Sequence, residues 1–278
     1  MRVGIVGYKK GKEAAETVKK FAEFLCAEGY DAVEFASHTD ICGVDVVLVL
    51  GGDGAILHSS IVAAKQGIKI IGINFGTLGF LTEYEKSEKE RVKELLIAIK
   101  NNSCRVLKRS ILQIGIGENV YYALNEVSIQ RDYGLNEYQA RQILSLELRC
   151  REGVDVISGD GILVCTPTGS TAYSLSAGGP VVEPTAQTMS VTPICTHNMR
   201  FSSYVLSPEH TLTVELERNG RKPVYLFVDE SRAFALRSDD RVIVRRSKHV
   251  TKLVRLSERS FCEIFAQKML PGGLTNEK

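Results

Sequence analysis

A short apolar run that stops at a cluster of glycines is the feature that most constrains the fold of this chain. Residues 46–50 read Val-Val-Leu-Val-Leu, and Gly51-Gly52-Asp53-Gly54 follows directly. Such a run, rich in β-branched residues, indicates a strand buried on both faces. Residues 55–66 are amphipathic and predict a helix. Asp53 is therefore expected at the carboxyl end of a strand, where open α/β sheets bind ligands.

Two roles fit Asp53, the one acid in this glycine-rich loop. The glycines let backbone N–H groups approach phosphates closely. An aspartate does not attract phosphate, because it is an anion, but it can accept a proton from a hydroxyl or hold a metal. The alternative role is structural, since Asp is a good helix N-cap. The loop alone supports the two roles about equally.

The N-terminal part of the chain alternates between strand and helix patterns. Strands are expected at residues 2–7, 32–35, 44–50 and 68–73, and helices at 12–28 and 55–66. This alternation is typical of a Rossmann-like α/β domain with a parallel sheet. The charged stretch 83–100 predicts a surface helix that leads out of this domain.

From residue 105 the pattern changes to β-rich, alternating segments separated by turns. These segments span residues 106–116, 120–130, 143–149, 211–217, 224–228 and 241–246. The predicted fold class is thus α/β plus all-β. The first domain covers residues 1–104, with a return segment at about 253–270, and the second covers 105–252. Residues 271–278 are expected to form a disordered tail.

The composition is that of an ordinary globular protein, and it argues against nucleic-acid binding and against a membrane span. Of 278 residues, 44% are hydrophobic and 24% are charged, and the net charge of +2 argues against a dedicated nucleic-acid binder. No apolar run approaches the length of a membrane span, and the N-terminus reads as a strand, not a signal peptide. Seven scattered cysteines without a Cys-x-x-Cys pair predict a reduced, cytoplasmic chain in which most cysteines are small core residues.

Three further segments place polar groups beside predicted strands. The glycine-rich residues 72–80 are expected beside the first loop if their two strands are neighbours; the alternative is an ordinary turn. Asn125-Glu126 follows a strand and can read an adenine edge and hold ribose hydroxyls, although most such pairs are turns. In residues 166–173, Ser170 or Thr171 can cap a helix whose start suits a polar ligand or a phosphate.

These motifs occur in the order and spacing of the NAD kinases, which the chain resembles from Met1 to about Leu270. They are Gly51-Gly52-Asp53-Gly54, Asn74-Phe75-Gly76-Thr77-Leu78-Gly79-Phe80, Asn125-Glu126-Val127, Gly159-Asp160-Gly161, and residues 166–173 followed by Ser176-Ala177-Gly178-Gly179-Pro180. The first motif is shared with phosphofructokinases and lipid kinases and is weakly specific. The last is highly specific.

The resemblance implies a fold, a reaction and an assembly. The fold is an N-terminal α/β nucleotide-binding domain and a C-terminal β-sandwich-like domain for NAD binding and oligomerisation, with the active site between them. The reaction is phosphorylation of the adenosine ribose 2′-hydroxyl of NAD to NADP by ATP or another phosphoryl donor, with a divalent metal, Mg²⁺. The assembly is a homodimer or homotetramer. The metal ligands and the choice between NAD and NADH are not implied.

The same match implies roles for individual residues. Asp53 is the general base. The adenosine half of NAD is held by Asn125, Glu126, Thr171 and Ala172. The nicotinamide half or its ribose lies near Asp160, Thr168, Tyr173 and Ser176, and Gly54 also contacts NAD. The loops that hold the phosphate region contain Gly51, Gly52, Asn74, Gly76, Leu78, Gly79 and Phe80.

The chain departs from the family pattern at three places, and two other functions stay open. Ala55 replaces a usual threonine, Glu230 follows Asp229 where glycine is usual, and Thr196 replaces a proline before His197, so the roles of Asp229 and His197 are undecided. One alternative is a sugar or lipid kinase, against which residues 166–173 argue. The other is a catalytically silent NAD(H)-binding sensor, against which the retained Asp53 argues.

Overall fold

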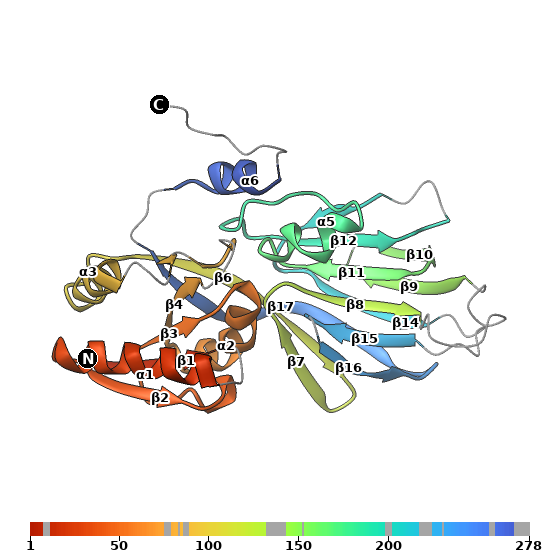
Figure 1. Ribbon diagram of the computed structural model, residues 1–278. Coiled ribbons are helices and arrows are strands. Elements are labelled where there is room, and N and C mark those ends of the chain that lie inside the picture. The colour runs from red at the N-terminus through yellow and green to blue at the C-terminus, as the bar shows by residue number, and fades with distance from the viewer. Residues whose placement is uncertain are drawn as a thin grey trace. The chain divides into compact units, whose positions relative to one another are not determined.

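The chain folds into two compact units built on different sheet types (Figure 1). The computed structural model describes residues 1–269 except 8–11, 75–78, 83, 86–88, 132–142, 152, 198–201, 217–223, 230 and 256–258. Unit 1 comprises Met1–Lys108 and Val250–Lys278, and unit 2 comprises Arg109–His249. The chain passes between the units inside strands β6 (Arg105–Ile116) and β17 (Arg241–Arg255). The predicted tail at 271–278 lies outside the described residues.

Unit 1 contains a parallel sheet with the order β17-β4-β3-β1-β2, in which β17 contributes its last residues. Its other strands are β1 (Arg2–Gly7), β2 (Asp31–Phe35), β3 (Val46–Leu50), β4 (Lys69–Asn74) and the short β5 (Tyr84–Glu85), which pairs with β4. The strand order reverses between β1 and β3. Open α/β sheets bind ligands beyond the carboxyl ends of the strands at such a point.

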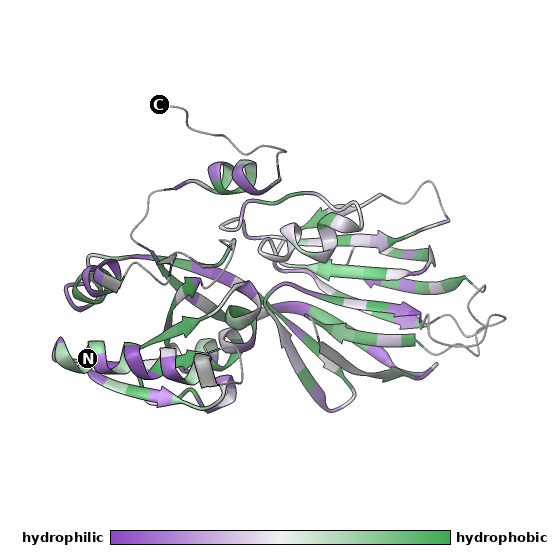
Figure 2. Cartoon of the chain, viewed as in Figure 1, coloured by the Kyte–Doolittle hydropathy of each residue, from purple (hydrophilic) through white to green (hydrophobic). Residues whose placement is uncertain are grey.

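Helices cover both faces of this sheet because its strands are apolar on both sides. These helices are α1 (Lys12–Ala27), α2 (Asp53–Gln66) and α3 (Lys89–Lys100). Unit 1 also contains α6 (Phe261–Met269) and a short 3₁₀ turn η1 (His38–Asp40). α1 carries both apolar and polar residues along its length (Figure 2). It packs Phe21 and Leu25 into the same core cluster as Leu95 and Leu96 of α3. α2 packs on the other face, where Ile56 would meet any side chain at Gly72.

The strand and helix pattern predicted for unit 1 is confirmed, with one correction. The predicted helix over residues 83–100 begins too early, because β5 occupies Tyr84–Glu85 and α3 starts only at Lys89. It is also not a surface helix throughout, since Val92, Leu95, Leu96 and Ile99 are buried. Lys and Glu residues at 83–100 obscured this apolar face in the sequence.

Unit 2 consists of two antiparallel sheets packed face to face. One has the order β10-β9-β14-β17, with β6 on β17 and β7 on β6, and the other has the order β13-β12-β11-β8-β15-β16. The strands not yet given are β7 (Asn119–Ala123), β8 (Glu126–Arg131), β9 (Leu144–Cys150), β10 (Gly153–Gly159), β11 (Gly161–Cys165), β12 (Met189–Ile194), β13 (Tyr204–Leu206), β14 (Thr211–Leu216), β15 (Val224–Val228) and β16 (Ser231–Leu236).

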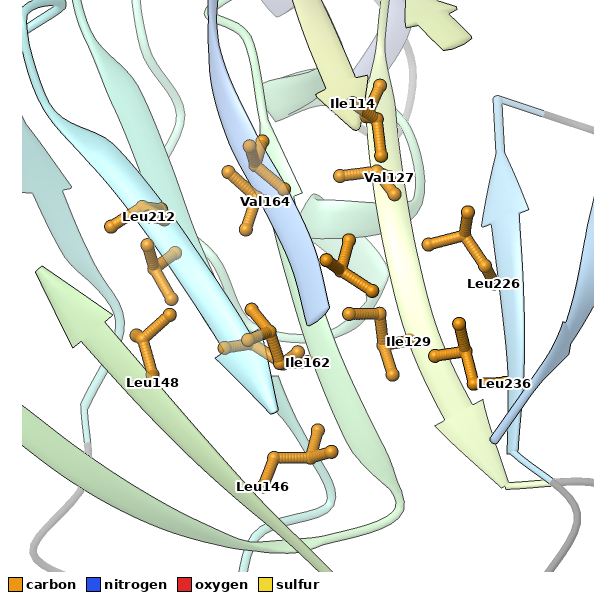
Figure 3. Close-up of a cluster of buried hydrophobic side chains, with 14 of the residues drawn as sticks. Ile114, Val127, Ile129, Leu146, Leu148, Ile162, Val164, Leu212, Leu226 and Leu236 are labelled. Carbon is orange, nitrogen blue, oxygen red and sulfur yellow. The ribbon is translucent and has the colours of Figure 1, made fainter. Parts of the chain in front are cut away.

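The inward side chains of the two sheets form one apolar core. Figure 3 shows Leu146, Leu148 and Leu212 of the first sheet together with Ile129 and Ile162 of the second. All belong to a single cluster of buried residues. Aligned sheets that share a core in this way form a β-sandwich, so the predicted all-β, sandwich-like architecture is confirmed.

The prediction that most cysteines are small core residues is wrong. Of the seven, only Cys165 is buried, and Cys26, Cys42, Cys195 and Cys262 are exposed. Burial raises the pKa of the Cys165 thiol to about 11, so this cysteine is a neutral core residue. Among the described residues, no helix combines the length and apolar character needed to span a bilayer.

Candidate active site

The two glycine-rich segments of unit 1 follow neighbouring strands, as predicted. β3 and β4 pair in parallel with Leu50 opposite Ile73. Just beyond, the Gly51 N–H donates to the Ile73 carbonyl at 2.8 Å. Because the carboxyl ends of paired parallel strands meet at one edge, the segments that follow them are brought side by side.

Asp53 is tied to the second segment by both carboxylate oxygens. Phe80 N donates to Oδ2 at 2.7 Å, and Leu81 N donates to Oδ1 at 2.9 Å. Asp53 is the first residue of α2, and the N-cap is Gly52, with no side-chain capping bond. The N-cap interpretation of Asp53 is therefore wrong. An anion in the first turn also interacts favourably with the helix dipole.

The surroundings of Asp53 leave little room for other side chains. A Cβ at Gly79 would overlap the Asp53 carboxylate, which explains why this position is glycine. The Gly79 N–H donates to Thr82 Oγ1 at 2.9 Å, so the segment is anchored on both sides of Phe80. Asn74 is the last residue of β4 and is only 2% exposed. The predicted loop residues Gly76 and Leu78 lie outside the described residues.

Ala55, which replaces the threonine usual in the family, also lies in a buried position. Ala55 is fully buried within the first turn of α2. Its methyl group has no hydroxyl to offer a ligand. Gly51 is buried, whereas Gly52 and Gly54 are partly exposed around Asp53. The exposed backbone beside Asp53 therefore comes from these two glycines.

In unit 2, the Asn125-Glu126 pair is fixed by the carboxylate of Asp229. Oδ2 accepts the Leu124 N–H at 3.0 Å, and Oδ1 accepts the N–H groups of Asn125 at 2.8 Å and Glu126 at 3.1 Å. Asp229 adopts a left-handed backbone with φ of 50°, and its own N–H donates to the Glu126 carbonyl at 2.9 Å. The sequence left the role of Asp229 undecided, and the structure shows that this residue shapes the segment that carries the pair.

The Thr166–Gly169 turn packs against the same pair. Thr166 Oγ1 donates to the Leu124 carbonyl at 2.6 Å, and its N–H donates to the Asn125 carbonyl at 2.8 Å. A Cβ at Gly169 would overlap the Asn125 carbonyl. Two predicted motifs more than forty positions apart are thus brought together.

Thr168 presents an unusual group in this turn. The residue is only 7% exposed, and its Oγ1 is buried without a hydrogen-bond partner among the described residues. A buried hydroxyl that lacks a partner costs free energy unless a bound molecule or water supplies one. Among the described residues predicted to bind NAD, the Thr168 hydroxyl therefore has an unused capacity for a hydrogen bond.

The prediction that Ser170 or Thr171 caps a helix is wrong. The helix α5 (Tyr173–Ser176) is a single turn after the 3₁₀ turn η2 (Gly169–Thr171), and its N-cap is Ala172, without a side-chain bond. Ser170 Oγ instead donates to the Pro167 carbonyl at 2.7 Å and accepts the Val182 N–H at 2.9 Å. The hydroxyl therefore closes the loop that follows α5.

The remaining predicted residues of unit 2 differ in exposure. Tyr173 is 39% exposed and its hydroxyl donates to Gln130 Oε1 at 3.3 Å; partial burial first, then the nearby Cys195, raises the pKa of this phenol. Asp160 forms a 2.7 Å ion pair with Arg131, in which both side chains are mostly buried. Ser176 and His197, like Tyr173, are exposed.

Two arginines near the predicted residues were not identified from the sequence. Arg131 pairs with Asp160, and Arg255 donates from Nη2 to the Phe80 carbonyl at 2.7 Å. Both lie at ends of strands, in segments without a recognisable motif. A buried position for a long cationic side chain has no local signature, so only the tertiary structure reveals them.

The described residues do not assemble a protein site for a metal ion. Within the described part of the chain, no group of three or more His, Cys, Asp or Glu side chains could hold one. The residues that the structure describes therefore do not fit a divalent ion held by protein ligands alone.

Comparison with known proteins identifies the family. The ATP-NAD kinase N-terminal domain model matches residues 31–104, and the ATP-NAD kinase C-terminal domain model matches residues 124–256. An NAD kinase from Methanothermobacter thermautotrophicus is 32% identical over 100% of this chain and 99% of the relative. One from Aquifex aeolicus is 29% identical over 97% of this chain and 99% of the relative.

Solved structures agree with the fold. The yeast NADH kinase complexed with NADH superposes with a TM-score of 0.83 at 22% identity, covering 100% of this chain and 88% of the other. An NAD kinase from Archaeoglobus fulgidus in complex with ATP gives a TM-score of 0.72 at 25% identity, covering 92% and 94%. With both domain models matched in order and a relative aligned over its full length, the chain belongs to the ATP-NAD kinase family.

Proposed function

We propose that this chain converts NAD to NADP by transferring a phosphoryl group from ATP to the adenosine ribose 2′-hydroxyl, with Asp53 as the general base. NAD kinase activity follows from family membership and from relatives aligned over nearly their whole length. The observation that supports Asp53 is its carboxylate, held by two backbone N–H groups among glycines at the carboxyl edge of a parallel sheet.

The geometry of Asp53 suits proton acceptance. Phosphoryl transfer depends mainly on positioning and charge stabilisation, and a well-placed base orients the attacking hydroxyl. Each carboxylate oxygen accepts one N–H, while an ionised carboxylate offers about four acceptor positions. The two backbone bonds therefore fix the direction of the group and leave lone pairs for the 2′-hydroxyl proton.

Substrate contacts are proposed for the residues that the family match singles out. Asn125, Glu126, Thr171 and Ala172 bind the adenosine half of NAD, and Asp229 shapes the segment that carries the first two. Asp160, Thr168, Tyr173 and Ser176 bind the nicotinamide half or its ribose. The buried, unpartnered Oγ1 of Thr168 supports a polar ligand there. Gly54 also contacts NAD. The phosphates lie along the loops of Gly51, Gly52, Asn74, Gly76, Leu78, Gly79 and Phe80.

A divalent metal belongs to the proposal only as a companion of ATP. Mg²⁺ in kinase sites is held largely by phosphate oxygens and water, with one or two carboxylates. It would offset phosphate charge when bound. This arrangement agrees with a chain whose described residues do not form a metal cage. A cytoplasmic location stays a prediction.

We also propose that the chain is a homo-oligomer that uses the outer face of the β10-β9-β14-β17 sheet. Paired residues on adjacent strands lie on the same face of a sheet. One row of paired residues crosses the four strands and consists of Val154, Arg149, Thr213 and Ile243. Val156 lies in the next row.

The composition of this outer face suits a second copy of the chain. Val154, Val156 and Ile243 are 48%, 51% and 42% exposed. The same face carries both signs of charge in the ion pairs Arg149–Glu147 and Arg241–Glu215. A two-fold interface needs a self-complementary surface of this kind.

The activity and the base are tested together by assaying ATP-dependent formation of NADP with the Asp53→Asn variant. We expect kcat to fall by about 10²–10⁴-fold, because amides do not accept the proton. Asn retains one of the two acceptor oxygens, so the thermal midpoint and NAD binding should be measured in parallel. Near-normal turnover by a folded variant would remove Asp53 as the base. Fructose 6-phosphate and diacylglycerol serve as control acceptors, and we expect no phosphorylation of either.

A further inference from the structure

One peptide group connects a buried arginine to the proposed base. The carbonyl oxygen of Phe80 accepts a hydrogen bond from Arg255 Nη2 at 2.7 Å. The N–H of the same peptide group, which belongs to Leu81, donates to Asp53 Oδ1 at 2.9 Å. The preceding N–H, that of Phe80, donates to Asp53 Oδ2 at 2.7 Å. The guanidinium and the carboxylate thus bind opposite ends of one peptide group.

Arg255 is placed where its charge has a large effect. It is the last residue of β17 and is only 5% exposed. Burial of a cation is costly and is tolerated when the charge makes good hydrogen bonds. A hydrogen bond from a charged donor is about twice as strong as a neutral one. The bond to the Phe80 carbonyl therefore holds this peptide group firmly in one orientation.

The orientation of the peptide group decides how Asp53 is held. Hydrogen bonds in a chain polarise one another, so a cation on the carbonyl oxygen makes the N–H of that peptide a better donor. The bond from Leu81 N to Asp53 is strengthened as a result. Without Arg255 the peptide can rotate, and the Asp53 carboxylate loses a fixed direction.

A second contact from the C-terminal part of unit 1 supports the same segment. Lys268 of α6 lies over the Phe80 ring, with Nζ 4.7 Å from the ring centroid. At this distance the ammonium group and the aromatic ring attract each other through a cation–π interaction. Residues 255 and 268 therefore hold Phe80 at its carbonyl and at its ring.

We infer that Arg255 is a positioning residue for the phosphoryl transfer, which acts on Asp53 through the Phe80–Leu81 peptide group. This inference rests on the proposed function, because it requires Asp53 to be the base. In this role Arg255 does not contact NAD or ATP. Its loss should therefore lower kcat and leave the KM values nearly unchanged.

The test compares steady-state kinetics of Arg255→Met and Arg255→Lys with those of the parent chain. Met fills a similar volume without charge. We expect Arg255→Met to lower kcat by roughly 10- to 100-fold, the size of effect that follows from a misplaced catalytic group. KM for NAD and for ATP should change by no more than about twofold. Arg255→Lys keeps the charge and should recover part of kcat.

Lys252→Met is the matched control. Lys252 lies on the same strand and also donates to a backbone carbonyl, that of Gly67 at 3.2 Å. It has no bond to the Phe80–Leu81 peptide, so kcat should stay at the parent value. If Arg255→Met folds poorly, Arg255→Ala is assayed with added guanidinium, and the neutral, similarly shaped urea serves as the comparison. Recovery of kcat with guanidinium alone supports the inference, and equal behaviour with both overturns it.

A double-mutant cycle with Asp53→Asn separates this inference from the proposed function. Once the base is absent, its positioning matters little, so adding Arg255→Met to Asp53→Asn should lower kcat far less than it does in the parent. An undiminished loss overturns the role of Arg255. If Asp53→Asn is impaired but Arg255→Met is not, only the positioning role fails. If Asp53→Asn turns over normally, the base assignment fails, and the role of Arg255 fails with it.

Discussion

Three aspartates next to glycines or turns serve three different purposes at the scale of single residues. Asp53 accepts two N–H groups and keeps free lone pairs. Asp229 accepts three N–H groups and shapes a chain segment. Asp160 pairs with Arg131. The side chains are chemically identical, so their functions are determined by the partners that the fold supplies.

Glu126 offers a residue-scale test of substrate binding. It is 7% exposed at the first position of β8, next to Asn125. If its carboxylate holds the adenosine ribose, Glu126→Ala should raise KM for NAD far more than KM for ATP, because uniform substrate binding is lost. Initial rates with each substrate varied in turn measure this. Glu118→Ala, at an exposed turn position, is the control. A larger change in KM for ATP than for NAD would contradict the assignment.

At the scale of elements, the β7–β8 connection depends on one carboxylate. Asp229→Ala leaves the N–H groups of Leu124, Asn125 and Glu126 without their acceptor. Loss of hydrogen bonds to a charged acceptor costs roughly 2–4 kcal/mol of unfolding free energy here. We expect a lower urea midpoint together with a raised KM for NAD. Asp239→Ala, at an exposed position in the turn between β16 and β17, should change neither. An unaltered KM for NAD in Asp229→Ala would show that the three bonds to Asp229 do not affect NAD binding.

Elements with a clear periodicity were predictable, and those without one were not. β3 is a pure apolar run and α1 has an apolar face, so both follow from the sequence. β12 was missed because all six residues, Pro193 and two hydroxyl residues included, are buried, so no alternation remains. β10 was missed because it begins and ends with glycine and its first four residues are exposed, so it resembles a loop in the sequence.

The motifs placed the proposed site residues along the chain, but not their partners. Backbone N–H groups, such as those of Phe80 and Leu81, are present in every residue and carry no sequence signal. Arg255 is separated from Phe80 by 175 positions. Asp229 is separated from the segment it shapes by 103 to 105 positions. Such long-range contacts are set by the packing of the whole unit, which local patterns do not encode.

At the scale of the whole molecule, the proposed homo-oligomer is tested by its mass in solution. Light scattering after size-exclusion chromatography should give a multiple of the 30.6 kDa chain. Replacing Val154 and Val156 together by Lys should shift this mass toward the monomer, because charges on both copies would be buried facing one another. Val181→Lys, at a 39% exposed position outside the strands, is the control. A monomeric parent, or an unchanged mass in the double variant, would refute the proposed interface.

The division of unit 1 into two chain segments has a consequence for the order in which the molecule is made. Unit 2 is continuous, whereas unit 1 is interrupted by it and is completed only by residues 250–278. A ribosome delivers Asp53 and Phe80 long before Arg255 and Lys268. Domains generally fold as they emerge during synthesis, yet the Asp53 loop receives its bond from Arg255 only after the whole of unit 2 has been synthesised. If Arg255 orients Asp53 as proposed, a chain that has not yet been synthesised as far as Arg255 contains the proposed base but not the contact that orients its carboxylate.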